Sequence, residues 1–281
     1  MAKKQQEQQY IMSELNTPLL NYQVYVMDAQ EKLTTFLLGF LAGGAIGLVF
    51  YGNLFLDDDG NLTRMSMISN VVVFIIVGII GWRVFTSMRT ESLKKKRMTE
   101  LTHQFRSFLE SLAVSLSSGM NVFDSLAGAH SDLQTEFSDN GYMTLEVKEM
   151  LSGIQNNIPI EEMLASLGER SGNDDIKNFA TVFEICYRTG GNLKEVVQRT
   201  NGIISERIEI KEEIETLMTS NKTQFTAMMV IPVVIILLMR VMSSTFAQSF
   251  ASPLGVVAMT IAIAIFYAAY VMGQKICNIE G

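Results

Sequence analysis

The sequence predicts an all-α, polytopic membrane protein with four transmembrane helices and one cytosolic antiparallel helical bundle. The first observation is that uncharged, apolar runs fall into two pairs, at residues 33–56 and 65–82 and at residues 225–239 and 241–274. A helix needs about 20 mostly apolar residues to cross a bilayer, so each pair predicts a transmembrane hairpin. The second is that apolar side chains between the pairs recur at helical spacing, without the alternation typical of strands.

The two pairs divide the chain into five segments. In order, we expect an N-terminal segment (1–32), a hairpin (33–86, spans about 33–53 and 66–86), a bundle with a basic juxtamembrane linker (87–222), a second hairpin (223–276, spans about 225–246 and 253–273) and a tail (277–281).

A cluster of basic residues predicts the orientation. Lys94, Lys95, Lys96 and Arg97 follow the second apolar run, and flanks rich in Lys and Arg stay in the cytoplasm. The loop between the first two runs carries Asp57-Asp58-Asp59 and is expected outside. Both termini and the bundle are therefore expected in the cytosol.

The middle segment has the periodicity of amphipathic helices. Its first apolar stripe consists of Leu101, Phe105, Phe108, Leu109, Leu112 and Leu116. Ser118-Gly119 is expected to end that helix and Asn121 to cap the next. Further helices are predicted at about 143–155, 159–167, 173–189 and 193–218.

One turn pattern occurs three times in the predicted bundle. At Gly190-Gly191-Asn192, the elbow, we expect one glycine to be left-handed and Asn192 to cap the long helix that runs into the third span. Gly119 to Asn121 repeats the pattern, and a looser copy has Pro159 at the first helical position. Ordinary capping chemistry would explain each copy singly.

The charge distribution favours a protein partner. The chain has a net charge of −7, but residues 98–222 hold 20 acidic and 10 basic side chains and carry −10. An acidic domain repels phosphate backbones, so nucleic acid is excluded as an expected partner. A partner with a basic docking face is favoured.

Catalytic and ligand-binding motifs are weak or missing. The sequence has no phosphate-binding glycine loop, so no nucleotide site, no cofactor and no enzyme activity are expected. His103 begins a faint sensor-kinase box without its acid and proline, and a surface histidine is the favoured interpretation. Asp57 begins a calcium-like loop without a Glu at its position 12.

Two acidic pairs are candidates for acid/base or cation sites. Glu161-Glu162 and Glu212-Glu213 are adjacent residues on helices, which point about 100° apart. A solvated helix face is therefore favoured, while a cation site built from separate helices stays open.

The apolar runs contain two candidate features. Gly39, Gly43 and Gly47 stand four residues apart, which predicts a close helix-packing face, ahead of general glycine enrichment in membrane helices. Arg240 is a charge within the third span. It is either a functional intramembrane group or an arginine that extends to the outer headgroups.

Short motifs follow one another in a fixed order between residues 101 and 242. Phe108-Leu109-Glu110-Ser111-Leu112 and Ser118-Gly119-Met120-Asn121 come first; Arg188-Thr189-Gly190-Gly191-Asn192-Leu193 and Ser205-Glu206-Arg207 follow. This order resembles the type II secretion system F domain of GspF- and PilC-like platform proteins. The second half is most similar to TadB and TadC of tight-adherence (Tad) pili. Relatives usually have two such domains and three spans, whereas this chain has one domain and four.

The resemblance implies a platform protein in the cytoplasmic membrane of a bacterium or archaeon. Such proteins bind a hexameric cytosolic secretion ATPase, contact pilin or pseudopilin subunits, and work as oligomers with themselves or with a paralogous F-domain protein. The resemblance also implies that the elbow, together with Arg207, is the partner or coupling region. A four-span transporter and a membrane signalling protein with a helical relay are the alternatives. The first would need polar residues converging within the membrane, of which there are few apart from Arg240 and Asn70, and the second lacks a catalytic output domain.

Overall fold

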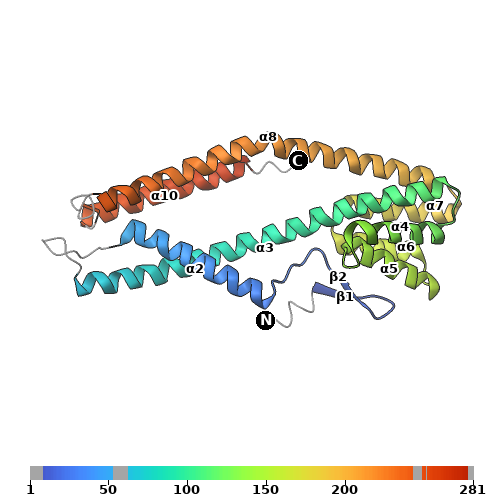
Figure 1. Cartoon of the computed structure of the whole chain (residues 1–281), viewed down its shortest axis with the longest axis horizontal. Helices are drawn as coiled ribbons and strands as arrows, with labels where there is room; N and C mark the ends of the chain where they lie inside the picture. The colour runs from blue at the N-terminus through green and yellow to red at the C-terminus, as the bar shows by residue number, and fades with distance from the viewer. Residues whose placement is uncertain (1–8, 53–62, 243–248, 251, 278–281) are drawn as a thin grey trace. The chain divides into compact units, whose positions relative to one another are not determined.

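We describe the protein from a computed structural model, which covers residues 9–52, 63–242, 249–250 and 252–277 (Figure 1). The elements are β1 (Tyr10–Met12), β2 (Pro18–Leu20), α2 (Ala29–Tyr51), α3 (Arg64–Ser117), α4 (Val122–Phe137), α5 (Tyr142–Gln155), α6 (Ile160–Ser171), α7 (Asp174–Thr189), α8 (Leu193–Met242) and α10 (Pro253–Cys277). The predicted all-α class is confirmed.

The chain forms two compact units. Unit 1 holds Met1–Val26 and Thr90–Ile210, and unit 2 holds Met27–Arg89 and Lys211–Gly281. Helices α3 and α8 therefore contribute residues to both units. Each unit is described by itself below.

Both long helices extend beyond the ranges predicted from the sequence. A basic linker was expected at the start of the bundle, but α3 is one helix from Arg64 to Ser117. Neither Gly nor Pro occurs between Trp82 and Ser117, so nothing there interrupts the backbone hydrogen bonds. Helix α8 extends beyond the range 193–218 to Met242, with Pro232 inside it, which agrees with the expectation that the helix after Asn192 runs into the third span.

The core of unit 1 is built from the predicted apolar stripe and its neighbours. Leu101, Phe105, Phe108 and Leu109 are fully buried, as a core-facing stripe requires. Helix α4 packs on α5, α5 on α6, and α6 on α7. The ring of Phe105 meets that of Phe179 edge to face, with centroids 5.5 Å apart, so α3 and α7 also share this core.

Two of the three predicted turns are confirmed. The Asn121 side chain accepts a hydrogen bond from the Asp124 N–H at 2.9 Å and caps α4. Gly190 ends α7 with a left-handed backbone. The third turn is shifted by one residue: Pro159 has extended backbone and precedes the first helical residue, Ile160.

Unit 2 contains apolar helices. Among the described residues, four helices are long and apolar enough to cross a membrane, namely α2, α3, α8 and α10. In α2 and α3, the Phe36 and Trp82 rings meet edge to face at 5.1 Å. In α8 and α10, Phe225 stacks on Tyr270 with centroids 6.2 Å apart.

The N-terminal segment contains an element that sequence analysis missed. Residues 9–26, which we call the strap, form a two-stranded antiparallel sheet and belong to unit 1. Tyr10 lies opposite Leu20 and Met12 opposite Pro18. Each strand has three residues, which is too short for a period-two pattern to register in the sequence.

Candidate functional site

The elbow lies between α7 and α8. The N–H of Gly190, at φ +71°, and the N–H of Gly191 both donate to the Cys186 carbonyl, the latter at 2.8 Å. The first is the bond of an αL cap and the second is the 6→1 bond of a Schellman cap. The Asn192 side chain accepts from the Glu195 N–H at 3.3 Å and caps α8. The predicted conformation is confirmed, while the coupling role stays a prediction.

The two glycines of the elbow are subject to different structural constraints. Gly190 is the left-handed residue, and a Cβ there would meet nothing within 4 Å. A Cβ on Gly191 would lie 2.8 Å from the Cys186 Sγ. Substitution at Gly190 therefore tests backbone conformation alone, whereas substitution at Gly191 tests packing.

Arg207 lies away from the elbow. It is 14 residues beyond Leu193 on α8, roughly 20 Å along the helix axis. Its Nη1 donates to the Asp175 carboxylate at 2.5 Å, and its side chain is 64% exposed. Arg207 thus joins α8 to the start of α7, at the opposite end from the elbow.

The glycines of α2 face α3 at close range. A Cβ added to Gly43 would lie 2.9 Å from the Val77 carbonyl oxygen and 3.0 Å from the Gly81 Cα. One on Gly39 would lie 3.0 Å from the Trp82 Cα, and one on Gly47 would lie 2.8 Å from the Val77 Cβ. In the structure, α2 and α3 therefore approach at a distance that larger side chains would prevent.

The basic cluster lies on α3. The side chains of Lys94, Lys95 and Lys96 are exposed. The Arg97 guanidinium instead lies over the Tyr25 ring, 4.4 Å from its centroid, and donates to the Val24 carbonyl at 3.4 Å. Three of these cations thus face solvent and the fourth holds the strap.

Two predicted features lie outside what the structure describes. One is the loop at Asp57-Asp58-Asp59. The other is the side chain of Arg240, whose backbone belongs to α8.

A buried polar cluster, which we call the clamp, fixes the strap to α5 and α6. Arg170 donates through Nη1 and Nη2 to both carboxylate oxygens of Glu146, at 2.7 and 2.6 Å, and each side chain is 4% exposed. The Tyr22 hydroxyl donates to Glu146 at 2.9 Å. Arg170 also donates to the Leu20 carbonyl at 2.9 Å, and its own carbonyl accepts from the Tyr22 N–H at 3.1 Å. The buried charges of this cluster are thus paired and hydrogen-bonded to each other.

Burial sets the ionisation of the clamp. Burial, together with the Glu146 carboxylate, raises the pKa of Tyr22 far above its ordinary 10.0. Burial alone would lower the pKa of Arg170, but the hydrogen bonds and negative charge of Glu146 raise it above its usual value. Tyr22 therefore stays neutral, and Arg170 stays charged, through the physiological range.

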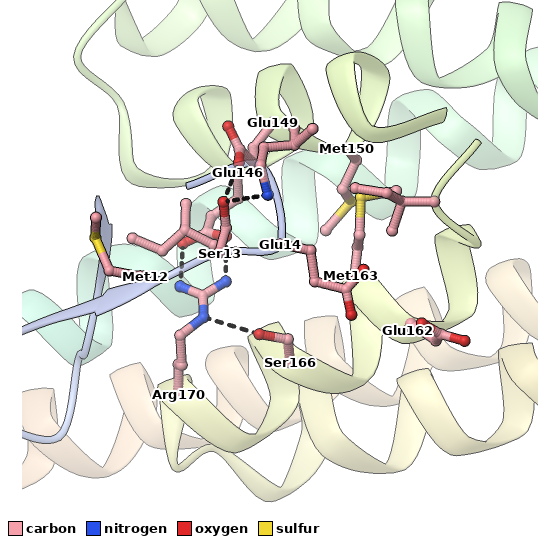
Figure 2. A pocket seen from close by; sticks show the side chains of 13 residues that line it. Met12, Ser13, Glu14, Glu146, Glu149, Met150, Glu162, Met163, Ser166 and Arg170 are labelled. Carbon is pink, nitrogen blue, oxygen red and sulfur yellow. Dashed lines mark hydrogen bonds and ion pairs between the residues drawn. The ribbon is translucent and has the colours of Figure 1, made fainter. Parts of the chain in front are cut away.

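A cavity of about 140 Å³ lies between the strap and helices α5 and α6 (Figure 2). Its lining combines apolar side chains, among them Met12, Met150 and Met163, with the carboxylates of Glu14 and Glu162. The clamp and the cavity were not predicted, because the strap residues lie more than one hundred positions before those of α5 and α6. Arg170 is buried in the structure, and Arg is almost never buried without a partner, but its burial is not visible in the sequence.

The acidic pairs do not assemble into a metal site. Within the described residues, no group of three or more His, Cys, Asp or Glu side chains is arranged to hold a metal ion. Glu161 instead accepts from the Arg188 Nε at 3.4 Å.

The comparison with known protein families gives a match, and it covers the bundle. Residues 108–241 match the family model of the type II secretion system (T2SS), protein F. We call this region the F domain. It begins within α3, includes α4 to α7 and ends within α8, so it holds the elbow and both charges of the clamp, but not the strap. Searches of curated proteins and of solved structures gave no match.

The match supports the family that the ordered motifs indicated. The F domain is typical of platform proteins in secretion and pilus systems, which are not enzymes and generally partner with secretion ATPases and with themselves. Together with the apolar helices, it indicates a membrane protein.

Proposed function

We propose that this protein is the inner-membrane platform of a Tad-like pilus or a type II secretion machine. In this role it couples a hexameric cytosolic secretion ATPase to pilin assembly or to protein export. The observation that carries the proposal is the F domain at residues 108–241, which begins within α3 and ends within α8, two of the four helices that are long and apolar enough to cross a membrane.

The strap supports the proposed topology. Residues 9–26 and the bundle contact each other within unit 1, so they lie on the same side of any bilayer. The chain between them must therefore cross an even number of times, which fits α2 and the first part of α3 as a hairpin. The lysines at 94–96 favour the cytosol as the shared side, with the loop at residues 57–59 outside.

The continuity of α3 and α8 supports the coupling role. Each helix contributes residues to the F domain and to an apolar stretch without a break, so a displacement of the bundle acts directly on a membrane helix. In this proposal the elbow at Gly190 to Asn192 fixes the start of α8 near the ATPase. The Gly39, Gly43 and Gly47 face holds the first hairpin together, and Arg240 is an intramembrane contact for a pilin or a paralogue.

A single F domain supports assembly with a second one, either from another copy or from a paralogue. The experiment is affinity purification of the tagged full-length chain from its native membranes in mild detergent. We expect the secretion ATPase and a second F-domain protein to co-purify, and no ATP hydrolysis by the chain alone.

A pair of glycine variants tests the elbow in the same purification. Gly190→Val forces a β-branched residue into a left-handed conformation and should reduce recovery of the ATPase at unchanged membrane abundance. Gly202→Ala, in open space on α8, should leave recovery unchanged. Absence of any ATPase with the wild-type chain would contradict the platform role, whereas full recovery with Gly190→Val would contradict only the elbow's part in it.

A further inference from the structure

The two edges of the strap's sheet are in different environments. The Ser13 N–H donates to the Thr17 carbonyl and the Asn21 N–H to the Gln9 carbonyl, both at 2.8 Å. In an antiparallel ladder, hydrogen-bonded pairs alternate with non-bonded ones. In this register the non-bonded pairs are Tyr10–Leu20 and Met12–Pro18. The backbone groups of these four residues therefore point away from the partner strand.

The outer edge of β2 is covered by the rest of unit 1. The Leu20 carbonyl accepts from Arg170, and the next outward N–H along the chain, that of Tyr22, donates to the Arg170 carbonyl. On the outer edge of β1, the backbone groups of Tyr10 and Met12 bond to no group among the described residues. β1 thus presents the open edge of this sheet.

The side chains of β1 do not block pairing at that edge. Open edges are usually protected by short strand length, Lys, Pro, a bulge or a covering element; β1 is short, at three residues, but reads Tyr-Ile-Met and carries no protective side chain. The side chains of Tyr10 and Met12 are 49% and 60% exposed. An extended peptide could therefore add a strand here by main-chain hydrogen bonding.

The adjoining cavity has the size and chemistry for one long cationic side chain. Met12 belongs both to β1 and to the cavity lining. At about 140 Å³, the cavity is smaller than the roughly 300–1,000 Å³ of a small-molecule site. Its apolar part, which includes Met150, Ile158 and Met163, suits the methylene stem of Lys or Arg.

The free charge around this cavity is negative. Glu146 is neutralised by Arg170, and Glu149 accepts from the Ser13 and Thr17 hydroxyls. Glu14 and Glu162 also line the cavity (Figure 2) and form no ion pair within the described residues. The net charge of −10 over residues 98–222 adds a field that attracts cations.

We propose that the strap and helices α5 and α6 form a docking surface for an extended, basic segment of a partner protein. The segment adds a strand to the open edge of β1 and places a Lys or Arg side chain in the cavity beside Glu14 and Glu162. This inference names a partner chemistry for unit 1 and goes beyond the proposed function, because binding by the purified chain requires neither export nor pilus assembly.

The test measures peptide binding to the full-length chain in detergent by fluorescence anisotropy. The probe is a labelled Lys-Val-Lys-Val-Lys-Val peptide, which as a strand presents all its lysines on one face; the matched probe has Glu in place of Lys. We expect the Lys peptide to bind, its affinity to fall with added salt, and the Glu peptide to bind at least ten-fold more weakly.

Two variants separate strand pairing from charge. Met12→Pro removes an outward N–H while leaving the β1–β2 ladder its own bonds, as Pro is tolerated on an edge; it should weaken binding about three- to ten-fold. Glu162→Gln should weaken binding several-fold, whereas the control Glu169→Gln, exposed on the same helix and outside the cavity, should not. Equal binding of the two peptides, or unchanged binding by both Met12→Pro and Glu162→Gln, would overturn the proposal. A third outcome would also overturn the proposal: the chain self-associates, Met12→Pro abolishes the self-association, and the Lys peptide does not bind. That result would identify the occupant of the β1 edge as a second copy of this chain.

Discussion

The elbow and the clamp both fix the course of the chain in unit 1, but they do so over different sequence distances. At the elbow, every hydrogen bond joins residues at most five positions apart, from Cys186 to Gly191 and from Asn192 to Glu195. In the clamp, Tyr22 and Leu20 bond to residues 124 and 150 positions away. The elbow therefore depends on backbone conformation, whereas the clamp depends on a buried charge pair.

The largest expected effect comes from breaking the clamp on one side. Arg170→Met leaves the Glu146 carboxylate buried without its cation, which should cost about 3–5 kcal/mol of unfolding free energy. Urea unfolding followed by circular dichroism, in detergent, measures this loss. Limited proteolysis should also cut the strap, because the Leu20 carbonyl loses its donor.

The matched control is the same substitution at an exposed ion pair. Arg188 contacts Glu161 and Glu184 with its side chain 58% exposed, so Arg188→Met should cost less than about 1 kcal/mol. If Arg170→Met were no more destabilising than Arg188→Met, the clamp would not hold the strap.

An intermediate effect is expected at the elbow. Gly190→Ala should cost about 1–2 kcal/mol, because an L-residue is strained at φ +71° although its Cβ meets no neighbour. Gly202→Ala, inside α8, should stabilise by about 0.5–1 kcal/mol. Thermal unfolding of both variants checks the contrast, and a neutral Gly190→Ala would mean that the turn relaxes freely.

A smaller effect should distinguish the hydroxyl of Tyr22 from its ring. Tyr22→Phe removes one buried hydrogen bond and should cost about 0.5–1.5 kcal/mol at neutral pH. The pKa of Tyr22 is raised in the folded state, so its contribution is fully present below the unfolded value of 10.0 and is lost as pH rises above it. The stability difference between wild type and Tyr22→Phe should therefore shrink above about pH 10. A constant difference from pH 8 to 11 would contradict this assignment.

The smallest effect is expected at Arg207, despite its short contact with Asp175. Its side chain is 64% exposed, so Arg207→Met should cost about 0.2–1 kcal/mol and less at high salt. A loss of several kcal/mol in the same unfolding assay would indicate that α7 and α8 depend on this pair.

The contrast between local and distant contacts also explains what the sequence could predict. The apolar stripe at 101–116, the Asn121 cap and the Gly190 turn follow from interactions within one or two helical turns, and all are confirmed. The strap was missed because β1 and β2 become stable only by packing on helices encoded far downstream. The continuity of α3 was missed for another reason: a change from apolar to charged residues predicts a change of surroundings but does not end a helix.

The long separation within the clamp has a consequence for biosynthesis. Leu20 leaves the ribosome 150 residues before Arg170, which is roughly 8–30 s at about 5–20 residues per second. Throughout that interval the strap has no binding site, while α2 and the first part of α3 are already available for insertion into the membrane. The strap is therefore the first part of unit 1 to be synthesised but among the last to fold. It can dock only after the nascent chain has been synthesised to the end of α6.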